Sequence, residues 1–363
     1  MPTTLPARSS ISGFRERAAR LAELAATPLV PEDYLDVFSP LASSASLRGR
    51  VVSIHPETVD AATLVIKPGR KWQAHTPGQY VRIGIDIDGV RQWRAYSLTS
   101  PIDRCDGCIT ITVKAMPDGF VSKHLVHEVQ VGTIIQLDQA CGEFVLGESA
   151  PKRTLFVTAG SGITPVMAML RDSADLLEDV VVLHSAPTEA DVIFGPELRK
   201  LDTQGRIRLI ERHTEIEGKL DIEMLADLVP DFVRRETWAC GPGGLLDALE
   251  QHYGEAGIEE QLHTERFRPS VVVPGEGGQV TFSGSETTVE ADGATPLLDV
   301  GEEAGVLMPS GCRMGICFGC VVPLREGAVR DLRSGDLTTA TPGDDVRIQT
   351  CVSAAAGACE IDS

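Results

Sequence analysis

The sequence predicts a multidomain α/β and β protein, in which an antiparallel β-barrel is followed by a parallel α/β domain and a smaller β-rich domain. Three patterns predict this architecture. Short alternating apolar runs fill residues 47–150, strand and helix patterns alternate over 151–268, and short strands flank a cysteine-rich loop over 279–363. A chain of 363 residues is long enough for two or three domains.

The composition argues against several classes of function. The formal net charge is −19, and such an acidic protein is poorly suited to bind nucleic acid, because phosphate backbones attract basic surfaces. No apolar run reaches the roughly 18 residues of a transmembrane helix, and the first residues lack the apolar stretch of a secretion signal. We therefore expect a cytoplasmic protein without a transmembrane segment.

Residues 1–46 are expected to form an N-terminal helical extension outside the three domains. Phe14, Ala18, Leu21 and Leu24 recur near helical spacing, which predicts a short amphipathic helix before a segment rich in proline. Packing of this helix on the body of the protein is the simpler interpretation. Docking onto a partner or a membrane surface is the alternative.

Residues 47–150 carry the pattern of a small antiparallel barrel. Several short strands at regular spacing, separated by Gly, Pro and Asp, are typical of that architecture. The expected strands are Val51–Ile54, Thr63–Ile66, Tyr80–Ile87, Ile109–Val113 and Ile134–Leu137. One helix is expected near Ser122–Val129.

Residues 151–268 alternate between strands and helices, which predicts an open parallel sheet with helices on its faces. The expected elements are the strands Thr154–Thr158, Val180–His184, Ile207–Glu211 and Thr237–Cys240 and the helix Pro165–Leu177. A linker rich in Gly and Pro follows over 269–278. The last segment, 279–363, is expected to contain the strands Gln279–Phe282 and Thr287–Ala291, a helix near Leu297–Glu303 and a closing strand at Val346–Thr350.

Four of the nine cysteines, Cys312, Cys317, Cys320 and Cys351, form the strongest chemical pattern in the chain. Their Cys-x4-Cys-x2-Cys…Cys spacing is the plant-type arrangement that binds a [2Fe–2S] cluster. A zinc site is the weaker alternative, since zinc sites normally combine two closely spaced cysteine pairs and only one end of this pattern has that form. Cys359 has no place in this pattern and is expected to be a surface or tail thiol.

The segment around these cysteines resembles the plant-type ferredoxin family over about residues 279–363. Gly311, Gly315 and Gly319 allow the loop to wrap tightly and to point its N–H groups at the sulfurs. The resemblance implies a β-grasp ferredoxin domain with a centre that carries one electron.

An ordered set of short motifs in the barrel resembles the flavin domain of the ferredoxin–NADP reductase superfamily. The set is Arg94-Ala95-Tyr96-Ser97, Val113-Lys114, Gly119-Phe120-Val121-Ser122 and Cys141-Gly142-Glu143-Phe144. The resemblance implies bound FAD, with Arg94 paired to its pyrophosphate, Tyr96 stacked on its ring system and Ser97 near N5. It also implies that Val113, Lys114, Gly119, Val121 and Ser122 contact the cofactor, with free N–H groups at a helix start facing phosphate. Barrel packing with a solvated arginine is the alternative.

Two glycine-rich turns in the α/β domain predict a dinucleotide site. A glycine-rich turn from a strand into a helix usually binds a dinucleotide phosphate. The first such turn in this chain contains Thr158, Gly160, Ser161, Gly162, Ile163, Thr164 and Pro165. The turn Cys240-Gly241-Pro242 is similar to the one that the superfamily places beside the nicotinamide. Cys240 is then a positioning residue, and Ser97 and Cys240 are the candidate catalytic residues. Glu265 and Phe267 resemble the superfamily's terminal motif beside the flavin, with interdomain packing as the alternative.

The choice between NADPH and NADH depends on the side chains at the ends of two expected strands of the parallel sheet. The superfamily usually has arginine where Pro187 stands, and that departure leaves the donor open. Ser185, Arg212 and Lys219 could supply a hydroxyl and positive charge for a 2′-phosphate, which favours NADPH over NADH.

Together, the resemblances cover residues 47–363 and imply an NAD(P)H-dependent reductase. A nicotinamide gives up two electrons at once and the cluster carries one, and FAD is the converter between them. The implied electron acceptor is an external oxygenase, hydroxylase or fatty-acyl desaturase, and a membrane desaturase would place the protein at the periphery of a membrane. A redox sensor or passive carrier is the alternative from another class.

Cys105 and Cys108 form a Cys-x2-Cys pair without a second pair beside it. We interpret these two cysteines as incidental, with a redox or zinc role as the alternative.

Overall fold

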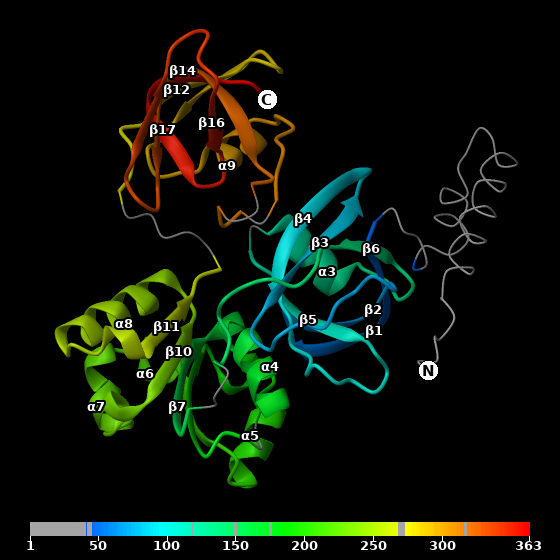
Figure 1. Ribbon diagram of the computed structural model, residues 1–363, viewed down its shortest axis with the longest axis vertical. Coiled ribbons are helices and arrows are strands. Elements are labelled where there is room, and N and C mark those ends of the chain that lie inside the picture. The colour runs from blue at the N-terminus through cyan, green and yellow to red at the C-terminus, as the bar shows by residue number, and fades with distance from the viewer. Residues whose placement is uncertain are drawn as a thin grey trace, which may run out of the picture.

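The computed structural model describes residues 41, 46–117, 119–147, 151–173, 176–267, 273–311, 313–315 and 318–363. Within them the chain forms three separate sheets (Figure 1). The helix expected near Phe14–Leu24 lies outside the described residues, as do Cys312 and Cys317. None of the described helices is long and apolar enough to cross a membrane.

The first sheet is an antiparallel barrel, as predicted. Its strands follow the order β4-β3-β6-β1-β2-β5, and every neighbouring pair is antiparallel. Leu98, just after β4, bridges to Ile111 in β5, so the two ends of the sheet meet and close the barrel. The strands are β1 Arg48–Thr58, β2 Ala61–Pro68, β3 Tyr80–Ile87, β4 Val90–Ser97, β5 Ile109–Lys114 and β6 Ile134–Leu137, and the helix is α3 Phe120–His127.

The second sheet is parallel, with the order β11-β10-β7-β8-β9. The chain runs outward from β7 through β8 and β9 and then returns to the other side of β7, so the strand order reverses between β7 and β10. Ligands of open α/β sheets bind beside the carboxyl ends of strands at such a reversal. The elements are β7 Arg153–Ala159, α4 Ile163–Ser173, β8 Asp179–Ala186, α5 Gly195–Thr203, β9 Arg208–His213, α6 Thr214–Glu217, α7 Leu225–Leu228, β10 Glu236–Cys240, α8 Gly243–Glu255 and β11 Leu262–Glu265, with a 3₁₀ turn, η1, at Gly160–Gly162.

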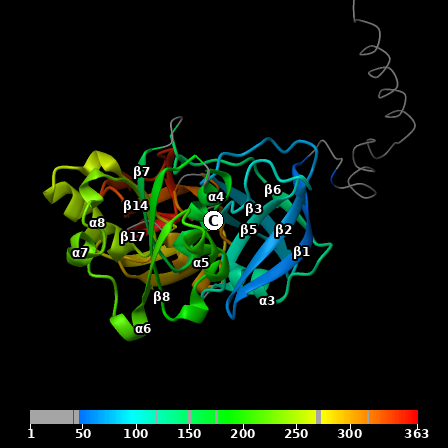
Figure 2. The same ribbon diagram turned by 90° about the horizontal axis from the view of Figure 1, so that it is seen from below.

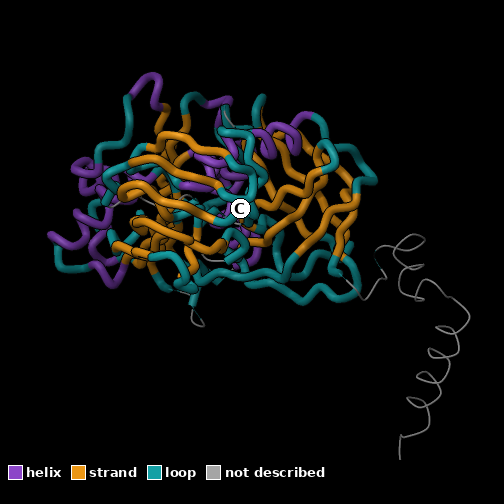
Figure 3. Tube along the Cα trace, turned by 90° about the horizontal axis from the view of Figure 1, so that it is seen from above, coloured by secondary structure: helices purple, strands orange, loops and turns teal. Residues whose placement is uncertain are grey.

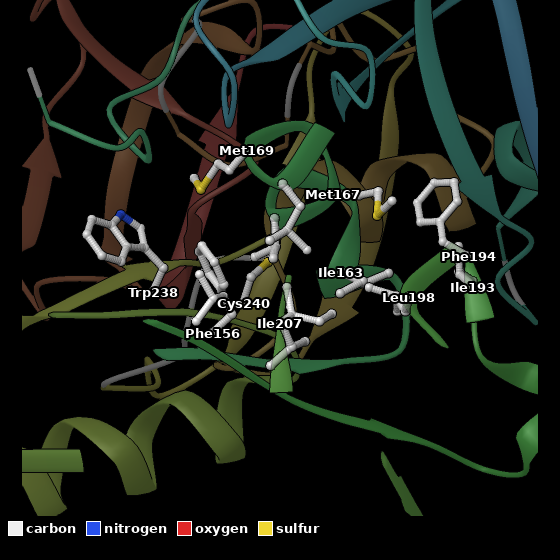
Figure 4. Close-up of a cluster of buried hydrophobic side chains, with 14 of the residues drawn as sticks. Phe156, Ile163, Met167, Met169, Ile193, Phe194, Leu198, Ile207, Trp238 and Cys240 are labelled. Atoms are coloured by element: carbon white, nitrogen blue, oxygen red, sulfur yellow. The ribbon is translucent and has the colours of Figure 1, made fainter. Parts of the chain in front are cut away.

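Each face of the parallel sheet is buried under helices (Figure 2). Phe156 and Trp238 belong to one apolar cluster with Met167 and Met169 of α4, on the face toward the barrel (Figure 4). Leu155 and its neighbours pack against Tyr253 of α8 on the other face. The expected strands are confirmed; β11 was not predicted, and α4 ends at Ser173 rather than at Leu177.

Side chains of α4 and β10 join the parallel sheet to the barrel. Arg171 donates to the Thr99 carbonyl at 2.6 Å and forms an ion pair with Glu197 at 2.6 Å. The Trp238 indole N–H donates to the Val145 carbonyl at 3.2 Å. The Arg171 contact places the residues just after β4 beside the carboxyl-terminal end of α4. In Figure 3 the barrel strands lie on one side, and the flanking helices gather on the other.

The third sheet is mixed, with the order β13-β12-β17-β14-β15, and β16 pairs with β14. The pair β12–β17 is parallel, and the remaining pairs are antiparallel. Gly275 and Gly277, inside the expected linker, already bond to this part of the chain. The elements are β12 Gly278–Phe282, β13 Thr287–Ala291, α9 Leu297–Glu303, β14 Val321–Asp331, β15 Leu337–Ala340, β16 Val346–Gln349 and β17 Ser353–Ile361.

The end of the chain differs from the expectation. The closing strand is β17, which lies between β12 and β14, and not the predicted strand at Val346–Thr350, which is β16. Cys359 in β17 pairs with Val280 and Gly327 and is buried in the apolar core of this sheet. Burial raises the pKa of the Cys359 thiol to about 11. The interpretation of Cys359 as a surface or tail thiol is therefore wrong.

Candidate active site and metal centre

The end of β4 carries a buried hydroxyl that has no partner in the protein. Ser97 lies opposite Tyr80 of β3 and is 4% exposed. Its Oγ forms no hydrogen bond with any described residue. A buried hydroxyl without a partner is costly, so such groups usually serve a ligand or a reaction. Ser97 therefore fits a cofactor that offers a hydrogen-bonding atom at this position.

Arg94 and Tyr96 lie on the other face of β4, two residues apart. Arg94 donates to the Trp93 carbonyl at 2.8 Å and forms no ion pair with a carboxylate among the described residues. Burial lowers the pKa of Arg94 to about 10, and the positive charge of Arg313 adds to this effect. Burial also raises the pKa of the Tyr96 phenol. A partly desolvated guanidinium without a carboxylate fits an anionic ligand such as a pyrophosphate.

The side chains of the other residues predicted to contact FAD pack or form bonds within the protein. Val113 and Val121 belong to the barrel core. Lys114 forms an ion pair with Asp60 at 2.5 Å. Ser122 accepts from Met116 N at 3.0 Å and donates to the Gly119 carbonyl at 3.1 Å. These residues can therefore offer a cofactor mainly their backbone groups.

The predicted dinucleotide turns lie against each other at the point where the strand order reverses. A Cβ added at Gly162 would lie 2.0 Å from the Cys240 carbonyl oxygen, so only glycine permits this approach. Gly160 has φ +55. Ile163, Thr164 and Pro165 open α4 and are buried, and Thr164 donates to the Ser161 carbonyl at 2.9 Å. The structure thus brings together the two loops that were predicted to hold the nucleotide.

A row of polar side chains crosses the sheet directly below these turns. The adjacent strands align Glu265, Cys240, Thr158 and His184 in register. Thr158 Oγ1 and His184 Nδ1 lie 2.8 Å apart, and His184 is fully buried. Burial lowers the pKa of His184 to about 4 and raises that of Glu265 to about 8; it also raises the pKa of Cys240. Cys240 is therefore a neutral thiol, suited to positioning and not to nucleophilic attack.

His184 was not predicted as a functional residue. It ends an otherwise apolar run, Val180–Leu183, and this change was the only signal in the sequence. Gly241 and Pro242 lead from Cys240 into α8, while Phe267 is 36% exposed beyond β11.

Ser185 and Arg212 meet at the carboxyl ends of β8 and β9. They are register partners, and both are buried. Arg212 Nη1 lies 3.2 Å from Glu217 Oε1, so its charge is already paired within the protein. The third residue considered for a 2′-phosphate, Lys219, follows this turn and is exposed.

Cys320 and Cys351 meet where β14 begins and β16 ends. Their sulfur atoms lie 3.2 Å apart, which is longer than the ~2.05 Å of a disulfide. Thr350 holds the pair together, because its N and Oγ1 both donate to the Cys320 carbonyl, at 3.2 and 3.0 Å. Hydrogen bonding with Cys351 lowers the pKa of the Cys320 thiol. Two buried cysteine side chains with adjacent sulfur atoms fit one metal centre.

The loop before Cys320 is supported by residues that sequence reasoning missed. The Gly315 carbonyl accepts from Gln349 Nε2 at 2.9 Å and from Arg333 Nη1 at 3.1 Å. Gly315 itself has φ +74, as expected for a tightly wrapped loop. Arg313 forms ion pairs with Asp299, at 2.8 Å, and with Glu302, both on α9.

The barrel, the parallel sheet and the cysteine pair together define a class of electron-transferring oxidoreductases. Residues 50–146 match the family described as oxidoreductase FAD-binding domain, and residues 280–356 match the 2Fe-2S iron-sulfur cluster binding domain. The chain belongs to the NAD(P)H oxidoreductases that combine these two domains. An NADPH oxidoreductase of Mycobacterium tuberculosis is 51% identical over 357 residues, which cover 96% of this chain and 92% of the relative.

Two further comparisons extend this result. The ferredoxin reductase component of the 3-ketosteroid-9-alpha-monooxygenase of Mycolicibacterium smegmatis is 31% identical, over 80% of this chain and 89% of the relative. The fold is similar to that of a phthalate dioxygenase reductase, with a TM-score of 0.61 and 21% identity over 88% of this chain and 98% of that one. The predicted fold class of residues 47–363, the family and the cofactors FAD and [2Fe–2S] are thereby confirmed.

Proposed function

We propose that this chain takes electrons from NADPH and delivers them one at a time to an oxygenase. The observation that carries the proposal is that one chain joins a flavin barrel, a nucleotide-binding sheet and a Cys320–Cys351 pair with sulfur atoms 3.2 Å apart. FAD, when bound, supplies the conversion of a hydride into single electrons, and the cluster supplies one-electron transfer.

The barrel residues bind and orient FAD. Arg94 pairs with the pyrophosphate, because its half-buried guanidinium has no carboxylate partner among the described residues. Tyr96 provides a ring for stacking on the isoalloxazine. Ser97 offers its unpartnered hydroxyl near the atom that accepts hydride. The backbones of Lys114, Gly119 and Ser122 complete the phosphate contacts.

The turns of the parallel sheet bind and orient the nicotinamide nucleotide. Free N–H groups of the Gly160–Gly162 turn face its phosphates. The neutral, buried Cys240 sits at the closest approach of the two turns and shapes the nicotinamide side. Ser185 and Arg212 bind the 2′-phosphate, which favours NADPH. Glu265 and Phe267 border the same site from β11.

Cys312, Cys317, Cys320 and Cys351 hold the [2Fe–2S] cluster. The relatives named as reductase components of monooxygenases make an oxygenase the favoured acceptor. The strongly acidic chain would dock on a basic face of that acceptor. A hydroxylase or a membrane desaturase is the second candidate, and it would place this cytoplasmic protein at a membrane surface.

A pair of acceptors tests the electron path. Ferricyanide can take electrons at the flavin, whereas cytochrome c reduction reports the path through the cluster. Cys351→Ser should keep NADPH-dependent ferricyanide reduction and lose cytochrome c reduction, while the control Cys105→Ser keeps both, because Cys105 is exposed and distant in sequence from the cluster loop. A wild-type holoprotein that reduces neither acceptor would be a redox sensor or passive carrier.

A further inference from the structure

Two buried polar atoms without partners belong to register partners at the carboxyl ends of β8 and β9, beside the proposed nucleotide site. Ser185 is 5% exposed and Arg212 is 8% exposed, and they face each other across β8 and β9. Neither Ser185 Oγ nor Arg212 Nε has a hydrogen-bond partner among the described residues. Buried groups of this kind indicate a site for a ligand that can accept hydrogen bonds.

The carboxylate of Glu217 occupies the anion position at this edge. Its Oε1 lies 3.2 Å from Arg212 Nη1, and its Oε2 accepts from the backbone N–H of His213 at 2.8 Å. The Glu217 carboxylate thus interacts with a guanidinium and a backbone N–H, the two kinds of donor that bind a phosphate.

The turn that carries Glu217 is held in place at both ends. Glu215 N donates to the Pro187 carbonyl at 3.1 Å, which joins this turn to the end of β8. Gly218 then leaves the turn with φ +75, a conformation that favours glycine. The backbone of this turn therefore holds the Glu217 carboxylate beside Arg212.

We propose that Glu217 limits how strongly the site prefers NADPH over NADH. The proposal depends on the proposed function, because it assumes that Ser185 and Arg212 receive the 2′-phosphate. A 2′-phosphate must displace Glu217 from Arg212 and meets like charge while doing so. A ribose 2′-hydroxyl needs no such displacement, and it can donate to the carboxylate. Glu217 thus weakens NADPH binding and supports NADH binding.

The test replaces the charge and keeps the shape. Glu217→Gln should bind 2′,5′-ADP about tenfold more tightly than the wild type does, as expected for the loss of one opposing charge beside a buried guanidinium. Its kcat/KM with ferricyanide should rise by a similar factor for NADPH and fall for NADH. Glu215→Gln is the matched control, because that side chain is exposed on the same turn. Calorimetry of the holoprotein with 2′,5′-ADP and with AMP gives the binding readout.

Arg212→Gln separates failure of this proposal from failure of the proposed function. If Arg212→Gln loses 2′,5′-ADP binding while Glu217→Gln matches the wild type, Arg212 binds the phosphate and Glu217 does not select the nucleotide. If Arg212→Gln leaves 2′,5′-ADP binding unchanged, the phosphate binds elsewhere, and both the proposal and the assignment of Arg212 are wrong.

Discussion

Gly162→Ala should open the nucleotide site by forcing its two turns apart. The added Cβ would lie 2.0 Å from the Cys240 carbonyl oxygen, 2.5 Å from its carbonyl carbon and 2.9 Å from Gly241 N. All three atoms belong to the backbone, so no side chain can rotate away. Because ordinary contacts begin near 3.4 Å, one turn must move by more than an ångström.

This displacement sets the size of the expected effect. Overpacking a tight contact costs about 1–3 kcal/mol of unfolding free energy. A misplacement of about 1 Å in a site that positions reactants can slow a reaction about 100-fold. We therefore expect a modest loss of stability in urea and a much larger loss in the rate of flavin bleaching by NADPH, measured by anaerobic stopped-flow absorbance.

Gly244→Ala is the matched control for this substitution. Gly244 lies in the first turn of α8, and a Cβ added there would meet no neighbouring atom within 4 Å. Alanine is favoured over glycine inside helices, so this variant should be at least as stable as the wild type and equally fast. If Gly162→Ala transfers hydride as quickly as Gly244→Ala, the two turns do not form the nucleotide site.

Three other substitutions test the flavin side and the buried carboxyl of Glu265 at the end of β11. Arg94→Ala should lower FAD affinity about 10–100-fold by removing a charge-assisted pair, measured as FAD retained after dialysis. Ser97→Ala should keep FAD and unfolding free energy, because its hydroxyl has no partner among the described residues, while hydride transfer slows. Glu265→Gln should change the pH dependence of stability. Burial raises the pKa of Glu265 to about 8, so the folded carboxyl keeps a proton that the unfolded chain loses near pH 4.5, and wild-type unfolding free energy falls across this interval.

Each of these expectations has a contrary result. If Arg94→Ala retains FAD fully, Arg94 does not bind the FAD pyrophosphate. A stability loss in Ser97→Ala without a change in rate would make that hydroxyl structural. Urea unfolding of Glu265→Gln with the same decline from pH 5 to 8 as the wild type would show that another group titrates there.

The backbone elements around the candidate sites were predictable from the sequence, because they depend on short motifs. The turns at Gly160–Gly162 and Cys240–Pro242 and the strand ending at Ser97 lie where their motifs placed them. Each motif joins a strand to a turn within a few residues, so its geometry is set by neighbours in the chain.

The features that were missed depend on contacts between distant segments. The strand β17 is enclosed because it pairs with β12 and β14, and nothing in the small residues before Cys359 announces that pairing. The bond between Thr158 and His184 exists only because β7 and β8 align in register. Likewise, Lys114 carries a charge suited to phosphate, but Asp60 on another part of the barrel pairs with it.

Electrons should pass from NADPH through FAD to the cluster within one chain. An anaerobic titration of the holoprotein with NADPH, followed by absorbance and by electron paramagnetic resonance, tests it most directly. The wild type should bleach both the flavin and the iron–sulfur bands and show the signal of a reduced cluster, whereas Cys351→Ser should bleach the flavin band alone. A wild-type cluster that stays oxidised after the flavin is reduced, or a normal [2Fe–2S] spectrum in Cys351→Ser, would contradict it.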